Sequence, residues 1–325
     1  MQVRVLGKSG IEVSEIGIGC WAIGGPDWNL NMEMGWGGAN DKQSQEGLFR
    51  AVDLGATHFD TADVYGHGHS ERILGKLVME IRRDRIIIGT KVGYFKGCAP
   101  SAYHPVHMRH QLEMSLNNLK TDYIDIYYFH NLHFGESDEY LEGAIEAMYR
   151  FKEEGKIRVI GQRGPHRYAP DRLNRVEEPE SKYERFLRIA SLVKPSVIQV
   201  RYNILTPTPE SSNVNIFTWA ETNGVGVVIN KPLGQGLLLD KYDPNSPPKF
   251  SVGDHRRRKS WFKAEGLRVL QRRLLPIKER FGYGMEDLVR VALQYCLATS
   301  QGACVVAGFK TPAQVEINLA AAGCY

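Results

Sequence analysis

Residues 57–91 decide the fold, and they read THFDTADVYGHGHSERILGKLVMEIRRDRIIIGTK. His58–Phe59 looks like a short buried strand that ends at Asp60, and an amphipathic helix begins at Ser70. The β-branched run RIIIG predicts a second strand, which Lys91 follows closely. Asp60 and Lys91 are therefore expected at the ends of two strands joined by one helix. In a parallel α/β architecture, functional sites are built at that edge.

Three side chains in this stretch suit the control of one proton. Tyr65 lies in a glycine-rich turn between Asp60 and Lys91. A phenol ordinarily titrates near pH 10, and a neighbouring ammonium group lowers its pKa, while a carboxylate keeps that ammonium charged and oriented. The set therefore predicts a general acid with a tuned pKa. His130 follows another strand pattern and is a candidate for hydrogen bonding to a substrate carbonyl.

The rest of the chain alternates strand and helix patterns. A hairpin is expected over residues 2–14, and a sixteen-residue helix over 139–154 is followed by Gly155, a residue typical of helix ends. The eight expected strands lie at 16–20, 58–60, 85–89, 124–129, 157–161, 197–200, 225–229 and 303–307. Eight strands that alternate with helices predict a (β/α)8 TIM barrel, with an N-terminal β-hairpin and a long loop after the seventh strand.

Composition restricts the class of protein. The chain has 325 residues, and its formal net charge of +4 is too small to indicate nucleic-acid binding. One domain over residues 1–325 is the simplest account, because no repeat or linker interrupts the pattern. Five cysteines, at positions 20, 98, 296, 304 and 324, form no CxxC motif. With no apolar signal or membrane-length segment, these features predict a soluble cytoplasmic protein.

Two long loops are expected at the rim of the barrel. The loop over residues 21–40 contains several aromatic residues, of which Trp21 and Trp28 are candidates to contact an apolar substrate. The alternative is that they only cover the barrel mouth. The loop over 232–262 is rich in proline and glycine and carries a basic run at 256–259, for which a solvated surface or a contact to a phosphate are both open.

The motifs DTADVYG, GTK and YYFH, in this order and spacing, resemble those of the aldo-keto reductases. The resemblance implies that Tyr65 is the proton donor, that Lys91 and Asp60 tune it, and that His130 orients the carbonyl. It implies an NAD(P)H-dependent oxidoreductase that acts on an aldehyde, ketone or sugar-like carbonyl, or on an alcohol in the reverse direction. The direction, the substrate and the oligomeric state are left open.

The resemblance also implies a nicotinamide cofactor, although the usual GxGxxG fingerprint of Rossmann folds is absent. NADP(H) is expected over NAD(H), because Lys310 beside the start of a helix at Thr311 suits a 2′-phosphate. Trp21, assigned to substrate above, is also included among the cofactor contacts. The others are Gln199, Asn230, Pro232, Leu233, Gly234, Gln235, Gly236, Gly308, Phe309, Lys310, Thr311, Gln314 and Asn318.

Three positions depart from the family pattern. Arg163-Gly164 stands where the family carries Ser-Asn to hold the carboxamide, Asn230 where an aromatic stacks on the nicotinamide, and Ile317 where an acid is usual. Arg163 is therefore assigned to a phosphate or an acidic substrate group. These departures keep an alternative open, a cofactor-binding regulatory or sensor subunit with little turnover. A metal site is not expected, because the histidines lack a complete set of ligands with recognised spacing.

Overall fold

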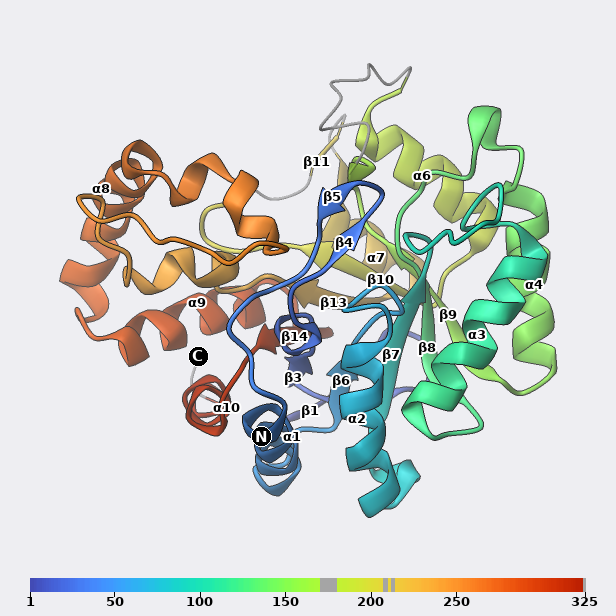
Figure 1. Ribbon diagram of the computed structural model, residues 1–325, viewed down its shortest axis with the longest axis horizontal. Coiled ribbons are helices and arrows are strands. Elements are labelled where there is room, and N and C mark those ends of the chain that lie inside the picture. The colour runs from blue at the N-terminus through green and yellow to red at the C-terminus, as the bar shows by residue number, and fades with distance from the viewer. Residues whose placement is uncertain (170–179, 207–209, 212–213, 324–325) are drawn as a thin grey trace.

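The computed structural model describes residues 1–169, 180–206, 210–211 and 214–323, so Cys324 lies outside the described residues. Its centre is a closed barrel of eight parallel strands in the order β10-β13-β14-β3-β6-β7-β8-β9 (Figure 1). The strands are β3 (Ile16–Gly19), β6 (His58–Asp60), β7 (Ile87–Val92), β8 (Ile124–Phe129), β9 (Ile157–Arg163), β10 (Val197–Arg201), β13 (Gly226–Asn230) and β14 (Ala303–Gly308). The predicted TIM barrel is confirmed.

Helices surround this barrel, as the alternating pattern predicted (Figure 1). They are α1 (Asp41–Asp53), α2 (His69–Glu80), α3 (Pro105–Leu119), α4 (Leu141–Glu153), α6 (Lys182–Val193), α7 (Ile216–Asn223), α8 (Ala264–Phe281), α9 (Met285–Thr299) and α10 (Pro312–Leu319). Gly155 has a φ of 72° just beyond α4, which is the backbone conformation that favours glycine at a helix end. The predicted helix boundaries differ from these by only a few residues.

The N-terminal hairpin closes the bottom of the barrel. Strands β1 (Val3–Val5) and β2 (Glu12–Ser14) pair antiparallel, as expected. Leu6, Ile11 and Val13 of this hairpin are buried in one cluster with inward-facing barrel residues such as Ile126 and Val228. The lower half of the barrel interior is therefore filled with apolar side chains, which leaves its other end for polar groups.

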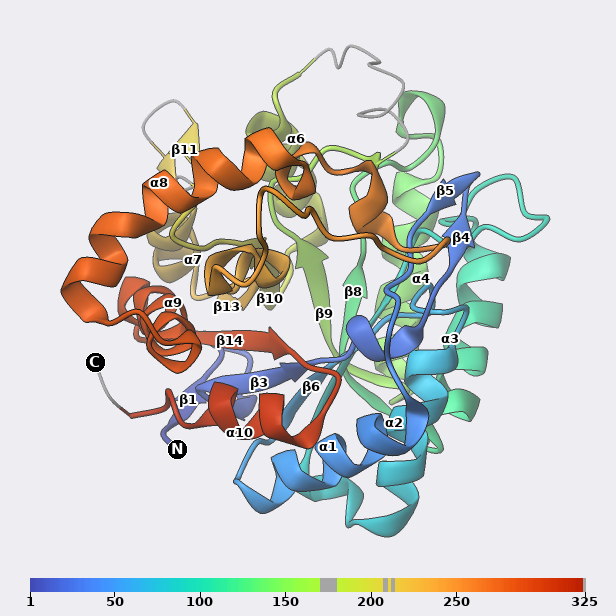
Figure 2. The same ribbon diagram turned by 60° about the vertical axis from the view of Figure 1, so that its left-hand side comes forward.

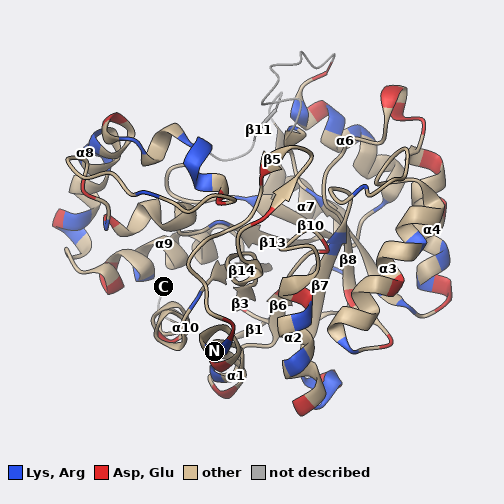
Figure 3. Ribbon diagram, viewed as in Figure 1, with Lys and Arg blue, Asp and Glu red and all other residues tan. Residues whose placement is uncertain are grey.

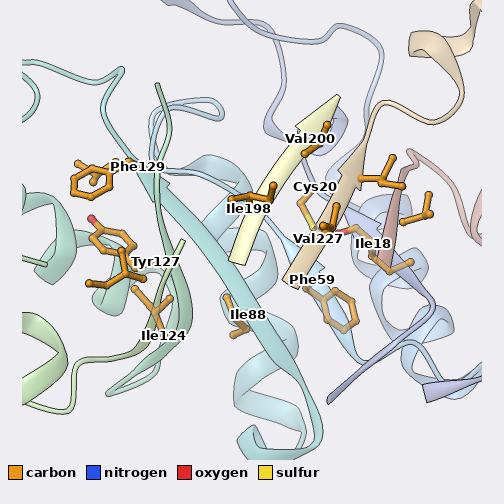
Figure 4. Packing of buried hydrophobic residues seen from close by; sticks show 14 of the residues in the cluster. Ile18, Cys20, Phe59, Ile88, Ile124, Tyr127, Phe129, Ile198, Val200 and Val227 are labelled. Carbon is orange, nitrogen blue, oxygen red and sulfur yellow. Dashed lines mark hydrogen bonds between the residues drawn. The ribbon is translucent and has the colours of Figure 1, made fainter. Parts of the chain in front are cut away.

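The main core lies between the barrel and the helices. Outward-facing strand residues such as Ile18, Phe59, Ile88 and Ile198 belong to this cluster and are fully buried (Figure 4). Side chains of one strand point alternately into this layer and into the barrel interior. Because both sides are buried, the strands are nearly continuous apolar runs in the sequence. This packing fixes the strand ends, and with them the residues at the mouth of the barrel.

The two long rim loops pack against each other over that mouth. Residues 28–33 form a small hairpin, β4 (Trp28–Asn29) with β5 (Met32–Glu33), which the sequence did not reveal. The segment before α8 contains the short 3-10 helices η5 (His255–Arg258) and η6 (Ser260–Phe262) and reaches this hairpin (Figure 2). Backbone hydrogen bonds join the loops, including one from Gly35 to the carbonyl of Gly253 (3.1 Å).

Charged residues of both signs are interspersed on the outer helices on the face shown in Figure 3. This distribution agrees with the small net charge of +4. Among the residues that the structure describes, none of the helices combines the length and the apolar character that crossing a bilayer requires.

Candidate active site

The structure brings Asp60, Tyr65, Lys91 and His130 together at the carboxyl ends of neighbouring strands. Asp60 ends β6, Lys91 lies in β7, and His130 follows β8 directly. Lys91 is thus the next-to-last residue of its strand, whereas the sequence had suggested that it follows the strand. The ring of Tyr65 is 5.8 Å from that of His130, centroid to centroid. Side chains distant in sequence therefore share one small volume.

A buried ion pair holds the amine of Lys91 beside the phenol of Tyr65. The Lys91 ammonium donates to Asp60 Oδ1 (2.8 Å) and to the backbone carbonyl of Thr61, and its Nζ lies 3.5 Å from the Tyr65 hydroxyl. Lys91 is 1% exposed and Asp60 is 4% exposed. Such a buried pair is rigid, because either partner alone would be a desolvated charge. Lys91 is therefore fixed in place within reach of the phenol.

The phenol of Tyr65 stays protonated. Burial raises the pKa of Tyr65 well above its usual range, the charge of Asp60 adds to this, and Arg163 acts in the opposite direction. The predicted lowering of the Tyr65 pKa is therefore wrong for the net direction, because burial outweighs the nearby cations. Burial likewise lowers the pKa of Lys91, and the Asp60 carboxylate opposes that change.

His130 is neutral in these surroundings. Burial lowers the pKa of His130 well below its usual range, and the charges of Lys91, Arg163, His166 and Lys231 lower it further. Its Nδ1 is buried and has no hydrogen-bond partner within the described part of the chain. A neutral imidazole can donate one N–H to a carbonyl oxygen without becoming charged.

A second network joins Asp60 to the ends of β9, β10 and β13. Gln199 donates from Nε2 to Asp60 Oδ2 (2.6 Å), and its Oε1 accepts hydrogen bonds from Arg163 Nη1 (2.9 Å) and Asn230 Nδ2 (2.8 Å). The side chain of Gln199 is therefore largely occupied by the protein itself. Asn230 Oδ1 is buried and unpaired among the described residues, which leaves an acceptor available to a ligand.

Aromatic rings cover the phenol on the side of the rim loops. Trp21 stacks on Tyr65 at 5.9 Å and on His255 at 4.2 Å, and its indole N–H donates to the carbonyl of Met34 (3.0 Å). The ammonium of Lys231 lies 4.9 Å from the Trp21 ring, a cation–π distance. Trp21 is thus beside the phenol of Tyr65, and its predicted contact to substrate stays a prediction.

Trp28 lies elsewhere on the rim. It is 49% exposed and lines a shallow surface depression of about 460 Å³ with Asn31, Glu33, Val252, Arg257 and Arg258. Its ring also packs close to Gly253. Trp28 therefore bridges the two loops, and its contact to substrate stays a prediction.

The basic run at 256–259 is buried at Arg256, exposed at Arg257 and partly exposed at Arg258 and Lys259. Arg256 is buried, pairs with Asp254 (2.5 Å) and stacks on the rings of Trp36 and Phe250, each at 4.1 Å. Arg257 forms an ion pair with Glu33 on the opposite loop. The interpretation of this run as a solvated surface is therefore wrong for Arg256, and Arg256 and Arg257 both contact the other rim loop.

The segments after β13 and β14, which are expected to contact the cofactor, bring together Lys241, Arg256 and Lys310. The sequence analysis had pointed only to Lys310 as a cation for the 2′-phosphate. Burial lowers the pKa of Lys310, and Arg256 lowers it further. Burial also lowers the pKa of Lys241, and Lys310 and Arg256 add to that effect. An alanine methyl at Gly236 would lie 3.5 Å from the Lys241 amine. Lys241, which the sequence analysis missed, therefore lies against the predicted pyrophosphate turn.

The segment after β14 has the expected form. Thr311 caps α10 and accepts from the backbone N–H of Gln314 (3.4 Å), while Gln314 Oε1 accepts from the N–H of Lys310 (2.8 Å). Asn318 donates to the carbonyl of Gly308 (3.1 Å). The Phe309 side chain is 1% exposed and belongs to the main core, so only its backbone is available to a cofactor.

An apolar wall beside Tyr65 includes a residue that the sequence analysis overlooked. Tyr94 follows Lys91 by three residues, and its ring meets that of His130 edge to face at 4.9 Å. It is 4% exposed and clusters with Met32 and Met34 of the first rim loop. The sequence signal that could have identified Tyr94 is its position two residues after the end of β7, the strand that carries Lys91.

The histidines considered for metal binding have protein partners instead. His67 pairs with Asp27 (2.6 Å), His69 with Asp41 (3.0 Å), and His107 Nε2 lies 2.8 Å from the carbonyl oxygen of Phe95. Within the described ranges, no three His, Cys, Asp or Glu side chains gather as they would around a metal ion.

Comparison with known proteins identifies the class. The model of the Aldo/keto reductase family matches residues 15–323. The chain is 30% identical to aldo-keto reductase YhdN of Bacillus subtilis, over 97% of this chain and 87% of the relative. It is 26% identical to L-galactose dehydrogenase of Arabidopsis thaliana, over 99% of this chain and 88% of the relative.

A solved structure agrees. An aldo-keto reductase from Bacillus halodurans in its holo form superposes with a TM-score of 0.71 at 27% identity, covering 100% of this chain and 92% of the other. The fold and the comparisons define an NAD(P)H-dependent oxidoreductase. The chain belongs to the aldo/keto reductase family.

Proposed function

We propose that the protein reduces a small aldehyde, ketone or sugar-like carbonyl with NADPH, and that Tyr65 is the general acid. The observation that carries the proposal is the buried Lys91–Asp60 pair, which holds an ammonium 3.5 Å from a phenol that burial keeps protonated. A proton donor must hold its proton until negative charge develops on the substrate oxygen. The cofactor, when bound, supplies the hydride that reaches the carbonyl carbon.

Four side chains take part in the proposed proton transfer. Tyr65 gives its proton to the developing alkoxide, and the Lys91 ammonium stabilises the phenolate that remains. Asp60 keeps Lys91 charged and in position through the 2.8 Å hydrogen bond. His130, neutral because burial and nearby cations lower its pKa, donates an N–H to the same carbonyl oxygen. The same groups serve the reverse oxidation of an alcohol.

The residues present fit a nicotinamide dinucleotide. The unpaired acceptor of Asn230 suits the amide N–H of a carboxamide. Lys310 and Arg256 lower the pKa of Lys241, and Arg256 lowers the pKa of Lys310, so a phosphate group would relieve the repulsion among these cations. Lys310 beside the start of α10, with Lys241 close to it, favours the 2′-phosphate of NADP(H) over NAD(H). Relatives carry both preferences in their names, since one is designated for NADP(+) and another is NADH-specific.

The substrate is proposed to be a small molecule. Relatives are named for L-galactose, L-glyceraldehyde 3-phosphate and methylglyoxal, which are compact and mostly polar carbonyl or hydroxyl compounds. We further propose that the chain is a single domain, since barrel strands run from β3 to β14. A reducing compartment such as the cytoplasm suits the free thiols of Cys20, Cys98, Cys296 and Cys304.

The test is Tyr65→Phe assayed with NADPH and a panel of carbonyls. The rate should fall by about 10²–10⁴-fold, the usual contribution of general acid catalysis, while the dissociation constant of NADPH stays nearly unchanged. Tyr127→Phe is the matched control, because the Tyr127 hydroxyl is buried without a hydrogen-bond partner among the described residues. A Tyr65→Phe variant that keeps more than about a tenth of the rate removes Tyr65 from the mechanism.

The same assay separates the alternative of a sensor subunit. The unmutated protein would then bind NADPH tightly and turn over none of the carbonyls, and Tyr65→Phe would change nothing. The occupied side chain of Gln199 is the feature that favours this alternative, because a ligand carboxamide must compete with Arg163 and Asn230 for its oxygen.

A further inference from the structure

One buried cation at the mouth of the barrel, Arg163, has no counter-charge among the residues that the structure describes. The buried lysine and arginine side chains of the described residues are Arg4, Lys91, Arg163 and Arg256. Arg4 lies 3.8 Å from Glu15, Lys91 lies 2.8 Å from Asp60, and Arg256 lies 2.5 Å from Asp254. Arg163, 7% exposed, makes one hydrogen bond to the neutral amide of Gln199 (2.9 Å) and no ion pair with a described residue.

An unpaired buried cation is costly and calls for a partner. Charged groups are almost never fully buried unless they are paired, because the desolvation penalty is several kcal/mol per ion. Burial accordingly lowers the pKa of Arg163, and the acidic groups that oppose this are Tyr65, Tyr94, Asp60 and Tyr128. Three of these four are phenols, and burial raises the pKa of Tyr65 and of Tyr128 far above neutrality. They provide no negative charge at pH 7.

The remaining carboxylate is already used. Asp60 gives Oδ1 to the Lys91 ammonium (2.8 Å) and Oδ2 to the Gln199 amide (2.6 Å). One carboxylate therefore stands against two cations, Lys91 and Arg163, so the cluster keeps one positive charge. Lys231 and His166 are also close to this site, because both lower the pKa of His130. The surroundings of the reacting carbonyl are electropositive.

We propose that the substrate carries an oxyanion group beside its reacting carbonyl and that Arg163 binds this group. The inference rests on the proposed function, because the carbonyl is placed by Tyr65 and His130. The hydrogen-bond chain Arg163–Gln199–Asp60–Lys91 leads back to the phenol, and Arg163 and Tyr65 lie near enough to shift each other's pKa, so the anion and the reacting carbonyl would share this end of the barrel. A planar guanidinium can hold a carboxylate or a phosphate through two parallel hydrogen bonds.

Matched pairs of substrates test the proposal. One pair is a 2-oxo acid and its methyl ester, and the other is glyceraldehyde 3-phosphate and glyceraldehyde. Within each pair, only one member carries an anionic group. The ratio of the two kcat/KM values therefore isolates the contribution of that group. The unmutated protein should prefer the charged member of at least one pair by roughly 10–100-fold, the range for a charge-assisted hydrogen bond. The pair that shows the preference distinguishes a carboxylate from a phosphate.

Arg163→Met should abolish the preference for the charged substrate by lowering its kcat/KM. The kcat/KM of the neutral substrate should change by less than about threefold. Arg163→Lys should retain part of the preference, because the charge remains and the planar fork is lost. Arg158→Met, near the other end of the same strand, is the control and should leave the ratio unchanged, because Arg158 pairs with Asp125 (2.7 Å) and not with Gln199. The thermal midpoint of Arg163→Met should stay level or rise, since removing an unpaired buried charge relieves its desolvation.

Three results would overturn the inference. One is equal kcat/KM for charged and neutral members in the unmutated protein. Another is an equal loss for both members in Arg163→Met, which would mean a purely structural role. The third is a large rise in the NADPH dissociation constant of Arg163→Met, which would assign the arginine to the cofactor. In each case Tyr65→Phe would still report separately on the proposed reduction. If Arg163→Met does not fold, Arg163→Lys and competitive inhibition of the unmutated protein by oxamate and inorganic phosphate decide the question.

Discussion

Replacing Lys91 by methionine should destabilise the protein as well as slow it, because this lysine is the buried counter-charge of Asp60. Methionine matches much of the length of lysine but removes the hydrogen bonds from Nζ to Asp60 Oδ1 and to the carbonyl of Thr61. Asp60, 4% exposed, would keep only the amide of Gln199 as a donor from another side chain among the described residues. A buried carboxylate would then stand without the cation that now faces it.

The size of the effect follows from that uncompensated charge. Removing one partner of a buried ion pair costs about 3–5 kcal/mol of unfolding free energy. Burial without a cation raises the pKa of a carboxyl group, so in the variant Asp60 binds a proton more tightly in the folded state than in the unfolded state. Stability therefore falls as the pH rises from about 4 towards neutrality, where the unfolded carboxyl has already lost its proton. The destabilisation should be larger at pH 8 than at pH 5.5.

Urea unfolding at these two pH values measures the effect in Lys91→Met, Asp60→Asn and the double variant. The double variant should be more stable than Lys91→Met alone, because it buries no unpaired charge. Lys76→Met, at an exposed position on α2, should stay within about 0.5 kcal/mol of the unmutated protein. Equal destabilisation at both pH values, together with strictly additive energies in the double variant, would contradict this reasoning.

Three further predictions follow from single contacts. Burial raises the pKa of Asp63 to about 8, so stability should fall between pH 4 and 8, and Asp63→Asn should remove that slope in urea unfolding and gain roughly 2–5 kcal/mol at pH 8. Lys310→Ala should weaken NADPH by about 10–100-fold and leave NADH nearly unmoved in fluorescence titrations. Gly75→Ala would place a methyl 2.1 Å from a backbone oxygen of α3 and should cost about 1–3 kcal/mol, whereas Gly302→Ala, with no atom within 4 Å, should be neutral in the same unfolding assay.

Much of the fold could be predicted from local pattern. Each barrel strand is a short apolar run that ends in a polar or glycine residue or is followed directly by one, and the helices between the strands carry the usual periodicity and end signals. Asp60, Lys91 and His130 were therefore assigned to one edge, since parallel strands end together. The hairpin β4–β5 escaped notice because strands of two residues carry no measurable periodicity.

The arrangement of side chains at the site could not be predicted in the same way. The direction of the Gln199 amide depends on Asp60, Arg163 and Asn230, which lie on three other strands. The charge state of Tyr65 depends on burial as well as on the neighbouring cations, and burial is a property of the assembled barrel. Similarly, the basic run looked solvated because Trp36 and Glu33, the partners of Arg256 and Arg257 on the other loop, come into contact only when the two rim loops meet.

Asp60 explains how the departures from the family pattern reach the catalytic residues. Its two carboxylate oxygens face different networks, Oδ1 towards the amine of Lys91 and Oδ2 towards the amide of Gln199. Arg163 and Asn230 both donate to the oxygen of that amide, so two donors orient the Gln199 side chain and Asn230 still holds it when Arg163 is replaced. A ligand that draws Arg163 away from Gln199 would thereby change the environment of the ion pair beside Tyr65. The proposed substrate binding at Arg163 and the proposed proton transfer at Tyr65 would thus be linked through one carboxylate, which is why substitutions at Arg163 should be assessed with kcat and KM separately.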